Sequence, residues 1–244
     1  MSVLLACRDL CKRYGALTVT DALSLEVRPG EALGVIGPNG AGKSTLFNLI
    51  AGGVRPDKGQ VIFDGQDITH LPPAARCKAG IGRSYQIPLP FSHMSVFENV
   101  LVGATFGAGR TERDAYGVCV DTLRRTGLLR RANHRAGALT LLERKRLELA
   151  RALVTDPRLL LLDEIAGGLT EAECEALVET VREVHAAGVA IVWIEHVLAA
   201  LRAVVSRIMV IDFGRKIAEG APEVVLRAPR VREIYLGVAE PAHA

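Results

Sequence analysis

The sequence has few cysteines, few aromatic residues and no long apolar run. Its five cysteines are Cys7, Cys11, Cys77, Cys119 and Cys174. They form no CxxC pair and do not lie near a histidine cluster in the sequence, which argues against a zinc site or a disulfide framework. Apolar runs such as "VAIVWI" are far shorter than the roughly 18 to 20 residues that a membrane-spanning helix needs. We therefore expect reduced, mostly buried thiols and no transmembrane helix.

The charge is nearly balanced, because 30 Lys and Arg residues face 27 Asp and Glu residues and the formal net charge is only +3. This balance gives no argument for nucleic acid as a partner. Residues 110–151 nevertheless carry eleven Arg or Lys against five acidic residues. The excess favours a solvated helical face, and a surface that meets lipid headgroups or a partner protein is the alternative.

The remaining composition is that of a globular protein. A chain of 244 residues with 49% hydrophobic residues can build one core that carries a smaller subdomain. Its start, "MSVLLACRDLCKRYG", lacks the charged and then apolar order of a secretory signal. We expect the protein to stay in the cytosol.

Short β-rich runs alternate with helical patterns, which predicts an α/β protein with a largely parallel sheet covered on both faces. The best strand candidates are nearly all apolar, as strands buried on both faces should be. They span residues 32–37, 159–163, 189–195 and 207–212. Between Ser2 and Phe63, the pieces "LSLEV" and "QVIFDG" indicate additional antiparallel strands joined by turns.

Residues 91–153 differ from their surroundings, since they have helical spacing, many arginines and few β-branched runs. We interpret them as a helical subdomain inserted into the core. No internal repeat and no low-complexity linker divides the chain. The sequence thus predicts a single domain over residues 1–238, with a loose tail at 239–244.

The segment "GPNGAGKST" follows a predicted strand and precedes a helical pattern. Its glycines allow successive NH groups to turn inward around phosphate oxygens, and the helix N-terminus adds partial positive charge. Lys43 would reach the β and γ phosphates, and the Ser44 hydroxyl would ligate Mg²⁺. We predict that this segment binds a nucleoside triphosphate. It comprises Gly37, Pro38, Asn39, Gly40, Ala41, Gly42, Lys43, Ser44 and Thr45.

A second candidate site segment, "LLLLDE", is an apolar strand that ends in two adjacent carboxylates, Asp163 and Glu164. Side chains at the exit of a strand can be aimed differently. Asp163 can therefore hold the Mg²⁺ while Glu164 orients a water on the γ-phosphate as general base. We expect hydrolysis of the bound nucleotide to be possible.

With these motifs in order, the chain resembles the ATP-binding subunits of ATP-binding cassette (ABC) transporters over nearly its whole length. The resemblance implies a P-loop NTPase fold with a mixed sheet, an N-terminal antiparallel β-subdomain and an inserted helical subdomain. It implies that Gln86 in "GRSYQ" links the nucleotide and its Mg²⁺ to the membrane subunit. It also implies that His196 in "IEH" contacts the γ-phosphate and that Tyr14 in "KRYG" stacks on adenine.

The segment "LTLLERKRLELARAL" resembles the family's signature helix, in which LSGGQ contacts the ATP held by the opposite subunit. Leu141, Leu142 and Glu143 stand where the family has Gly-Gly-Gln. Thr140 and Glu143 form a capping-box pattern, so the helix can still begin at this point and Thr140 can still bond a phosphate. The side chains of the two leucines occupy space that glycines leave open. We expect a weakened or rearranged contact rather than a misfolded helix.

A second departure follows the two carboxylates. The segment "DEIAGGLTE" has Ile165 in place of the family's proline, Thr170 in place of Asn or Asp, and Glu171 in place of a second proline. In the family this loop also crosses to the opposite site. The residues that hold the chain's own ATP are intact, so the pattern predicts an asymmetric pair of sites.

Within the family, the chain is most similar to the ATPases of branched-chain amino acid importers, through "RSYQ", "HMSVFENVLVG", "LELARALVTDPRLLLLDE", "IEH" and "EIYLG". This implies integral membrane permease subunits, a second ATPase subunit and, indirectly, a solute-binding protein as partners. It implies a location on the cytoplasmic face of the plasma membrane. The segment "IPLPFSHMSVFENV" would receive a short helix of the permease.

Four alternatives remain open from the sequence. Lipopolysaccharide-exporter ATPases share much of this pattern, and the chain could also be a regulatory half that hydrolyses little ATP. Glu164 and His196 argue against the second, since they serve hydrolysis. An ABC protein of repair or translation would usually carry a second cassette or a long coiled coil. A kinase or GTPase with a phosphate loop would lack "LELARAL".

Overall fold

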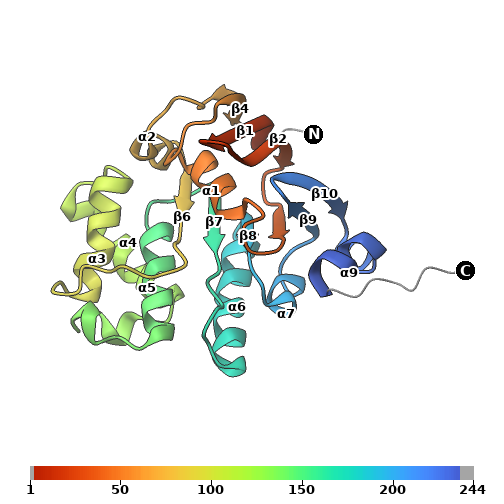
Figure 1. Cartoon of the computed structure of the whole chain (residues 1–244). Helices are drawn as coiled ribbons and strands as arrows, with labels where there is room; N and C mark the ends of the chain where they lie inside the picture. The colour runs from red at the N-terminus through yellow and green to blue at the C-terminus, as the bar shows by residue number, and fades with distance from the viewer. Residues whose placement is uncertain (1–2, 237–244) are drawn as a thin grey trace, which may run out of the picture.

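The computed structural model describes residues 3–236, and its centre is a sheet of six strands in the order β10-β9-β3-β8-β7-β6 (Figure 1). Strands β9, β3, β8, β7 and β6 run parallel, and β10 pairs antiparallel with β9 at the edge. These strands are β3 (Ala32–Ile36), β6 (Ile81–Arg83), β7 (Leu159–Asp163), β8 (Ala190–Ile194), β9 (Arg207–Asp212) and β10 (Arg215–Gly220). The four strands predicted from apolar runs are confirmed.

An antiparallel sheet in the order β2-β1-β4-β5 forms the N-terminal part of the chain. It consists of β1 (Leu5–Tyr14), β2 (Leu17–Val27), β4 (Lys58–Phe63) and β5 (Gln66–Asp67). Its inner face and helix α1 (Lys43–Ala51) share one hydrophobic cluster with the parallel sheet, which includes Leu10, Phe47 and Val61. The predicted antiparallel strands are therefore also confirmed.

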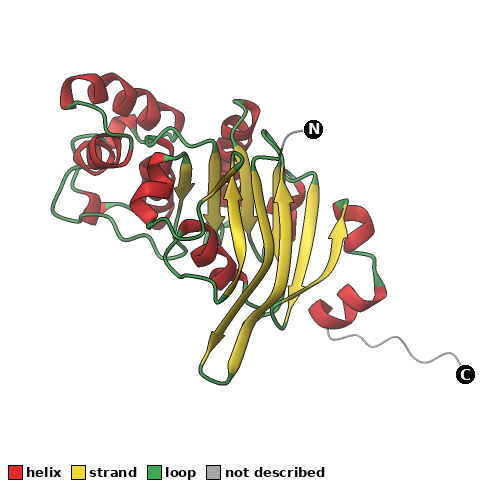
Figure 2. Ribbon diagram, turned by 90° about the horizontal axis from the view of Figure 1, so that it is seen from above, coloured by secondary structure: helices red, strands yellow, loops and turns green. Residues whose placement is uncertain are grey.

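The opposite face of the parallel sheet is covered by helices α6 (Glu171–Ala186) and α7 (Leu198–Arg202), which enclose Trp193. Figure 2 shows the strands gathered in the middle of the molecule with helices at both ends. Two helices, α8 (Pro222–Val225) and α9 (Pro229–Leu236), follow the edge strand β10. The predicted loose tail at 239–244 lies outside the described residues.

The segment 91–153 is built only from helices and loops, and its elements lie together beside the sheet (Figure 1). They are α3 (Val96–Val102), the π-helix η1 (Gly103–Gly107), α4 (Glu112–Arg125), the 3-10 turns η2 (Leu129–Arg131) and η3 (Ala136–Ala138), and α5 (Leu141–Leu153). A separate hydrophobic cluster packs α3, α4 and one side of α5 together. This separate core supports the division that we propose, in which the helical part is a subdomain inserted into a single domain.

Three further features bear on what was predicted from the sequence. Helix α2 (Pro73–Lys78) and strand β6 come between the antiparallel sheet and the helical part, and the sequence patterns indicated neither. Among the residues that the structure describes, no helix is both long and apolar enough to span a membrane. Cys7 and Cys119 are buried, but Cys11, Cys77 and Cys174 are only half-buried, so the prediction of mostly buried thiols is wrong for those three.

Candidate functional site

The site lies where the parallel strands end. In a parallel sheet the carboxyl ends of all strands meet at one edge, and ligands bind there. The exits of β3, β7 and β8 carry the phosphate loop, the pair Asp163–Glu164 and the pair Glu195–His196, respectively. Segments that are up to about 160 residues apart in the sequence (37 to 196) therefore meet at one edge because of the strand order.

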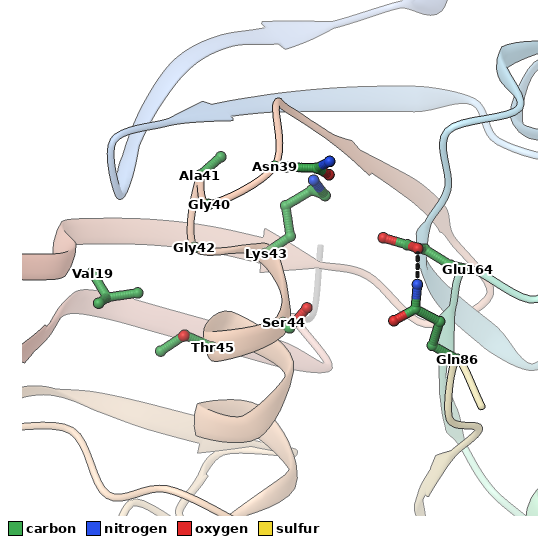
Figure 3. A pocket seen from close by; sticks show the side chains of 10 residues that line it. All are labelled: Val19, Asn39, Gly40, Ala41, Gly42, Lys43, Ser44, Thr45, Gln86 and Glu164. Atoms are coloured by element: carbon green, nitrogen blue, oxygen red, sulfur yellow. Dashed lines mark hydrogen bonds between the residues drawn. The ribbon is translucent and has the colours of Figure 1, made fainter. Parts of the chain in front are cut away.

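The phosphate loop lines a cavity of about 290 Å³ (Figure 3). Helix α1 begins at Lys43 after Gly42, which has φ +102° and contributes no side-chain cap, so its first NH groups are left for a ligand. A Cβ on Gly42 would lie 2.5 Å from the backbone oxygen of Val19, which explains the glycine at this position. The cavity is lined by Val19, Asn39, Gly40, Ala41, Gly42, Lys43, Ser44, Thr45, Gln86 and Glu164.

Lys43 is folded back onto its own loop. In Figure 3 its side chain runs alongside the loop, and its Nζ donates to the carbonyl oxygens of Gly37 at 2.7 Å and Pro38 at 3.0 Å. Burial lowers the pKa of Lys43, while the carboxylates of Glu164 and Asp163 act in the opposite direction. Phosphate oxygens would offer this ammonium full negative charge in place of two carbonyl dipoles.

Asp163 and Glu164 point to different partners, as predicted from their position at the strand exit. Asp163 is 6% exposed, and its Oδ2 lies 3.4 Å from a guanidinium nitrogen of Arg83. Burial raises the pKa of the Asp163 carboxyl, and Arg83 opposes this effect. The carboxylate of Asp163 is thus paired with Arg83, and Asp163 is not among the residues that line the phosphate-loop cavity.

Glu164 joins the other two predicted residues. Its Oε1 lies 3.0 Å from Nε2 of His196, and its Oε2 accepts a hydrogen bond from Nε2 of Gln86, drawn as the dashed line in Figure 3. The backbone of Glu164 has φ +46°, which is rare for a residue with a side chain. The structure therefore brings Gln86, Glu164 and His196 into one group beside the phosphate loop.

Two predicted contact residues lie elsewhere. Tyr14 is half-exposed at the end of β1, where the ammonium of Lys12 lies 5.6 Å from its ring centre, and it is not one of the residues that line the cavity at the phosphate loop. Thr140 caps helix α5: the Glu143 NH donates to its Oγ1 at 3.3 Å, and its own NH donates to Glu143 at 3.0 Å. The predicted capping box is confirmed, and both nucleotide contacts stay predictions.

The oxygen donors suit Mg²⁺. Ser44, Gln86 and Asp163 line a neighbouring cavity of about 420 Å³ and offer a hydroxyl, an amide oxygen and a carboxylate. No group of three or more His, Cys, Asp or Glu side chains suited to a metal occurs among residues 3–236. A cation that takes one carboxylate from the protein and further oxygens from substrate phosphates fits this donor set.

Three charged residues near the site were not identified from the sequence. Arg83 donates to Asn48 of α1 at 2.7 Å and also faces Asp163. Lys145 and Glu195 are 5% and 1% exposed and contact the backbone around Glu164. The only sequence signal was that Glu195 directly precedes His196 after an apolar strand.

Comparisons with known proteins show which proteins this chain is similar to. A profile of the ABC transporter family matches residues 20–167, and a profile described as a branched-chain amino acid ATP-binding cassette transporter matches residues 215–241. The chain is 34% identical to the high-affinity branched-chain amino acid transport ATP-binding protein LivG of Escherichia coli, covering 97% of this chain and 98% of that protein. It is 35% identical to BraF, a protein of the same description from Pseudomonas aeruginosa, with 94% and 96% covered.

Another relative is similar to the chain in sequence, and two solved structures have the same fold. The lipopolysaccharide export system ATP-binding protein LptB of Acidithiobacillus ferridurans is 34% identical, with 97% of this chain and 98% of that protein covered. A crystal structure of the ADP conformation of an ATP-binding cassette superposes with a TM-score of 0.90 at 31% identity, over 98% of this chain and 100% of that one. A nucleotide-free cassette superposes with a TM-score of 0.89 at 31% identity, over 96% and 99%.

Proposed function

From its place in the ABC transporter family, to which the chain belongs as an ATP-hydrolysing subunit with the P-loop NTPase fold, we propose that it powers the import of branched-chain or related amino acids. The observation that carries the hydrolytic role is the contact of Glu164 with both Gln86 and His196 beside the phosphate loop. A carboxylate so placed can orient a water and accept its proton.

Each residue of the group has a proposed role. The loop NH groups and Lys43 bind the phosphates, and Lys43 leaves the carbonyl oxygens of Gly37 and Pro38 to do so. Glu164 acts as general base, and His196 holds the Glu164 carboxylate and contacts the γ-phosphate. Gln86 holds the base in its present position until the nucleotide draws its amide away. Tyr14 and Thr140 are proposed to contact the adenine of the chain's own ATP and the ATP of the opposite subunit.

Magnesium would be held by Ser44, Gln86 and Asp163, and when bound it neutralises charge on the phosphates. Arg83 keeps the Asp163 carboxylate in place from the other side through the 3.4 Å contact. This pairing also offsets part of the cost of burying the Asp163 charge.

The proposed partners are permease subunits, a second ATPase subunit and, through the permease, a solute-binding protein, with the chain at the cytoplasmic face of the plasma membrane. Ile87, Leu89 and Phe91 are 69%, 76% and 46% exposed. Exposed apolar side chains close together in the sequence support permease docking next to Gln86. A helix of the permease seated there would contact the same loop that holds Gln86.

An exporter ATPase is the second candidate, because LptB is 34% identical to the chain. The match of residues 215–241 to the branched-chain amino acid profile favours the importer. Deleting the gene and measuring uptake of labelled leucine and valine separates the two. Unchanged uptake of these amino acids and of related solutes would contradict the importer.

The hydrolytic role is tested by ATP binding and turnover of the purified chain. We expect Glu164→Gln to bind ATP like wild type and to lose turnover by a factor of about 10² to 10⁴, because a positioned base contributes this much. Lys43→Ala should lose ATP binding itself. The surface variants Glu112→Gln and Lys78→Ala serve as matched controls. Normal turnover in Glu164→Gln would remove Glu164 as base, and unchanged ATP affinity in Lys43→Ala would contradict the phosphate-loop assignment.

A further inference from the structure

Two buried charged side chains lie near the group formed by Gln86, Glu164 and His196 but do not line the phosphate-loop cavity. Lys145 on α5 is 5% exposed, and Glu195 at the exit of β8 is 1% exposed. Burial lowers the pKa of the Lys145 ammonium, and the negative charges of Glu195 and Glu164 oppose this shift. Charged side chains are rarely buried so completely unless they are paired and hydrogen-bonded. Their contacts therefore indicate what they do.

Both side chains form hydrogen bonds to the backbone of Glu164 or of residues close to it in the structure. Lys145 Nζ donates to the carbonyl oxygen of Glu164 at 3.3 Å. Glu195 Oε2 accepts from the Ala166 NH at 2.9 Å, and its Oε1 accepts from the His196 NH at 3.0 Å. One carboxylate thus holds the turn after Glu164 and the backbone of His196 at the same time.

The backbone of Glu164 needs such support. Its φ of +46° lies in the left-handed region, which costs a residue with a side chain about 1–2 kcal/mol. Such conformations persist only where surrounding contacts fix them. The NH of Glu164 donates to the carbonyl oxygen of Ile194 at 2.8 Å, its carbonyl accepts from Lys145, and Glu195 fixes the turn two residues later.

We propose that Lys145 and Glu195 are positioning residues that hold Glu164 in its left-handed conformation, so that its carboxylate faces His196 and Gln86. This inference rests on the proposed role of Glu164 as general base. Glu195 cannot replace Glu164 in that role, because it is 1% exposed and both its oxygens accept backbone NH groups.

The position of Lys145 has a consequence for regulation. Lys145 belongs to α5, the helix that begins with Thr140, and its ammonium is the contact from that helix to the carbonyl of Glu164. A shift of α5 relative to the sheet stretches or breaks this contact. The conformation of the base is then coupled to the position of the helical part.

The test uses ATP affinity, turnover and a double-mutant cycle. We expect Lys145→Met and Glu195→Gln to bind ATP within about twofold of wild type. Their turnover should fall by about 10- to 100-fold, since a misplacement of about 1 Å can cost that much. Lys145→Arg, which keeps the charge and a donor, should recover most of the turnover. Lys216→Met, which breaks the 2.7 Å surface pair with Glu219, is the matched control.

The decisive measurement repeats both substitutions in the Glu164→Gln background. A positioning residue has no base left to position there, so the residual turnover should fall no further. A second readout is amide hydrogen exchange by mass spectrometry, in which peptides covering residues 163–167 should lose protection while distant peptides, such as those of β1, keep theirs. Hydrogen exchange tests the inference if the isolated chain hydrolyses ATP too slowly for turnover to be compared. If Lys145→Met does not fold, Glu195→Gln is used alone for both measurements.

Two turnover results would overturn the inference: wild-type turnover in both single variants, or an equal fractional loss with and without Glu164. Unchanged protection of residues 163–167 would also overturn it. These failures differ from the failure of the proposed hydrolytic role, which normal turnover in Glu164→Gln would show.

Discussion

At the scale of single residues, Cys7 shows how strongly position in the fold sets chemistry. Its side chain, on strand β1 of the antiparallel sheet, is 1% exposed, and burial raises the pKa of its thiol to about 12. The thiol therefore stays protonated up to strongly alkaline pH, and the thiolate is the reactive form. We predict that Cys7 resists iodoacetamide at pH 8 in the folded protein. Peptide mass spectrometry should show half-buried Cys77 and Cys174 labelled first, and Cys7 labelled only after denaturant is added; early labelling of Cys7 would contradict its burial.

The same scale explains which site residues the sequence could predict. Asp163 ends an apolar strand, His196 comes two residues after one, and Lys43 belongs to the loop motif that follows a third. The exits of parallel strands meet at one edge. Lys145 gave no such signal, because a lysine within "ERKRLE" looks like a residue on a solvated helical face. Its burial depends on the packing of α5 against the loop after β7, which are separated in the sequence. Arg83 was missed for the same reason, since its partners are Asn48 and Asp163.

At the scale of elements, α5 keeps a regular helical start despite its two leucines. Leu141 is 44% exposed, and a Cβ on Gly168 would lie 3.3 Å from its Cδ2, whereas Leu142 packs against the core. Changing both to glycine should lower the free energy of unfolding by at least about 2 kcal/mol, from two helical glycines and lost burial. We predict that ATP turnover nevertheless rises, because the side chains no longer block approach to the opposite ATP.

Alanine at both positions is the control for this prediction, since it preserves the helix and removes the bulk but leaves a Cβ. Thermal unfolding measures the loss of stability, and turnover at saturating ATP measures the gain. Unchanged turnover in both double variants would mean that the leucines do not obstruct the contact with the opposite ATP.

A strand such as β7 was predictable from the sequence, because its whole length is an apolar run. Strand β6 was not, because it has only three residues and forms by pairing with β7.

At the scale of the whole molecule, the departures from the family pattern are unevenly distributed. The phosphate loop, Asp163, Glu164 and His196 keep the family pattern. The departures, which include Leu141, Leu142 and Thr170, lie in segments that the family resemblance assigns to the opposite site. Thr170 is used locally to cap α6, where its NH donates to Glu173 at 2.9 Å. The fold of one chain was predictable from its own sequence, but the composition of the two-chain site that we propose was not, because in that proposal a partner chain supplies part of the site.

This uneven distribution predicts complementation between two forms of the chain. A donor that carries Lys43→Ala together with Leu141→Gly and Leu142→Gly should have no turnover, because it cannot bind ATP. Added to the wild-type chain, it should raise turnover several-fold, since its glycines can complete the intact site of the wild-type subunit. Lys43→Ala alone, which keeps both leucines, is the matched donor. Two outcomes would contradict this prediction: equal stimulation of turnover by the Lys43→Ala donor, or turnover of the wild-type chain alone that already equals that of the mixture. In either case the helix with both leucines can complete the opposite site, and two identical subunits are enough for hydrolysis. Stimulation by the glycine donor only would mean that hydrolysis at Lys43 and Glu164 requires a partner ATPase with a different helix at this position.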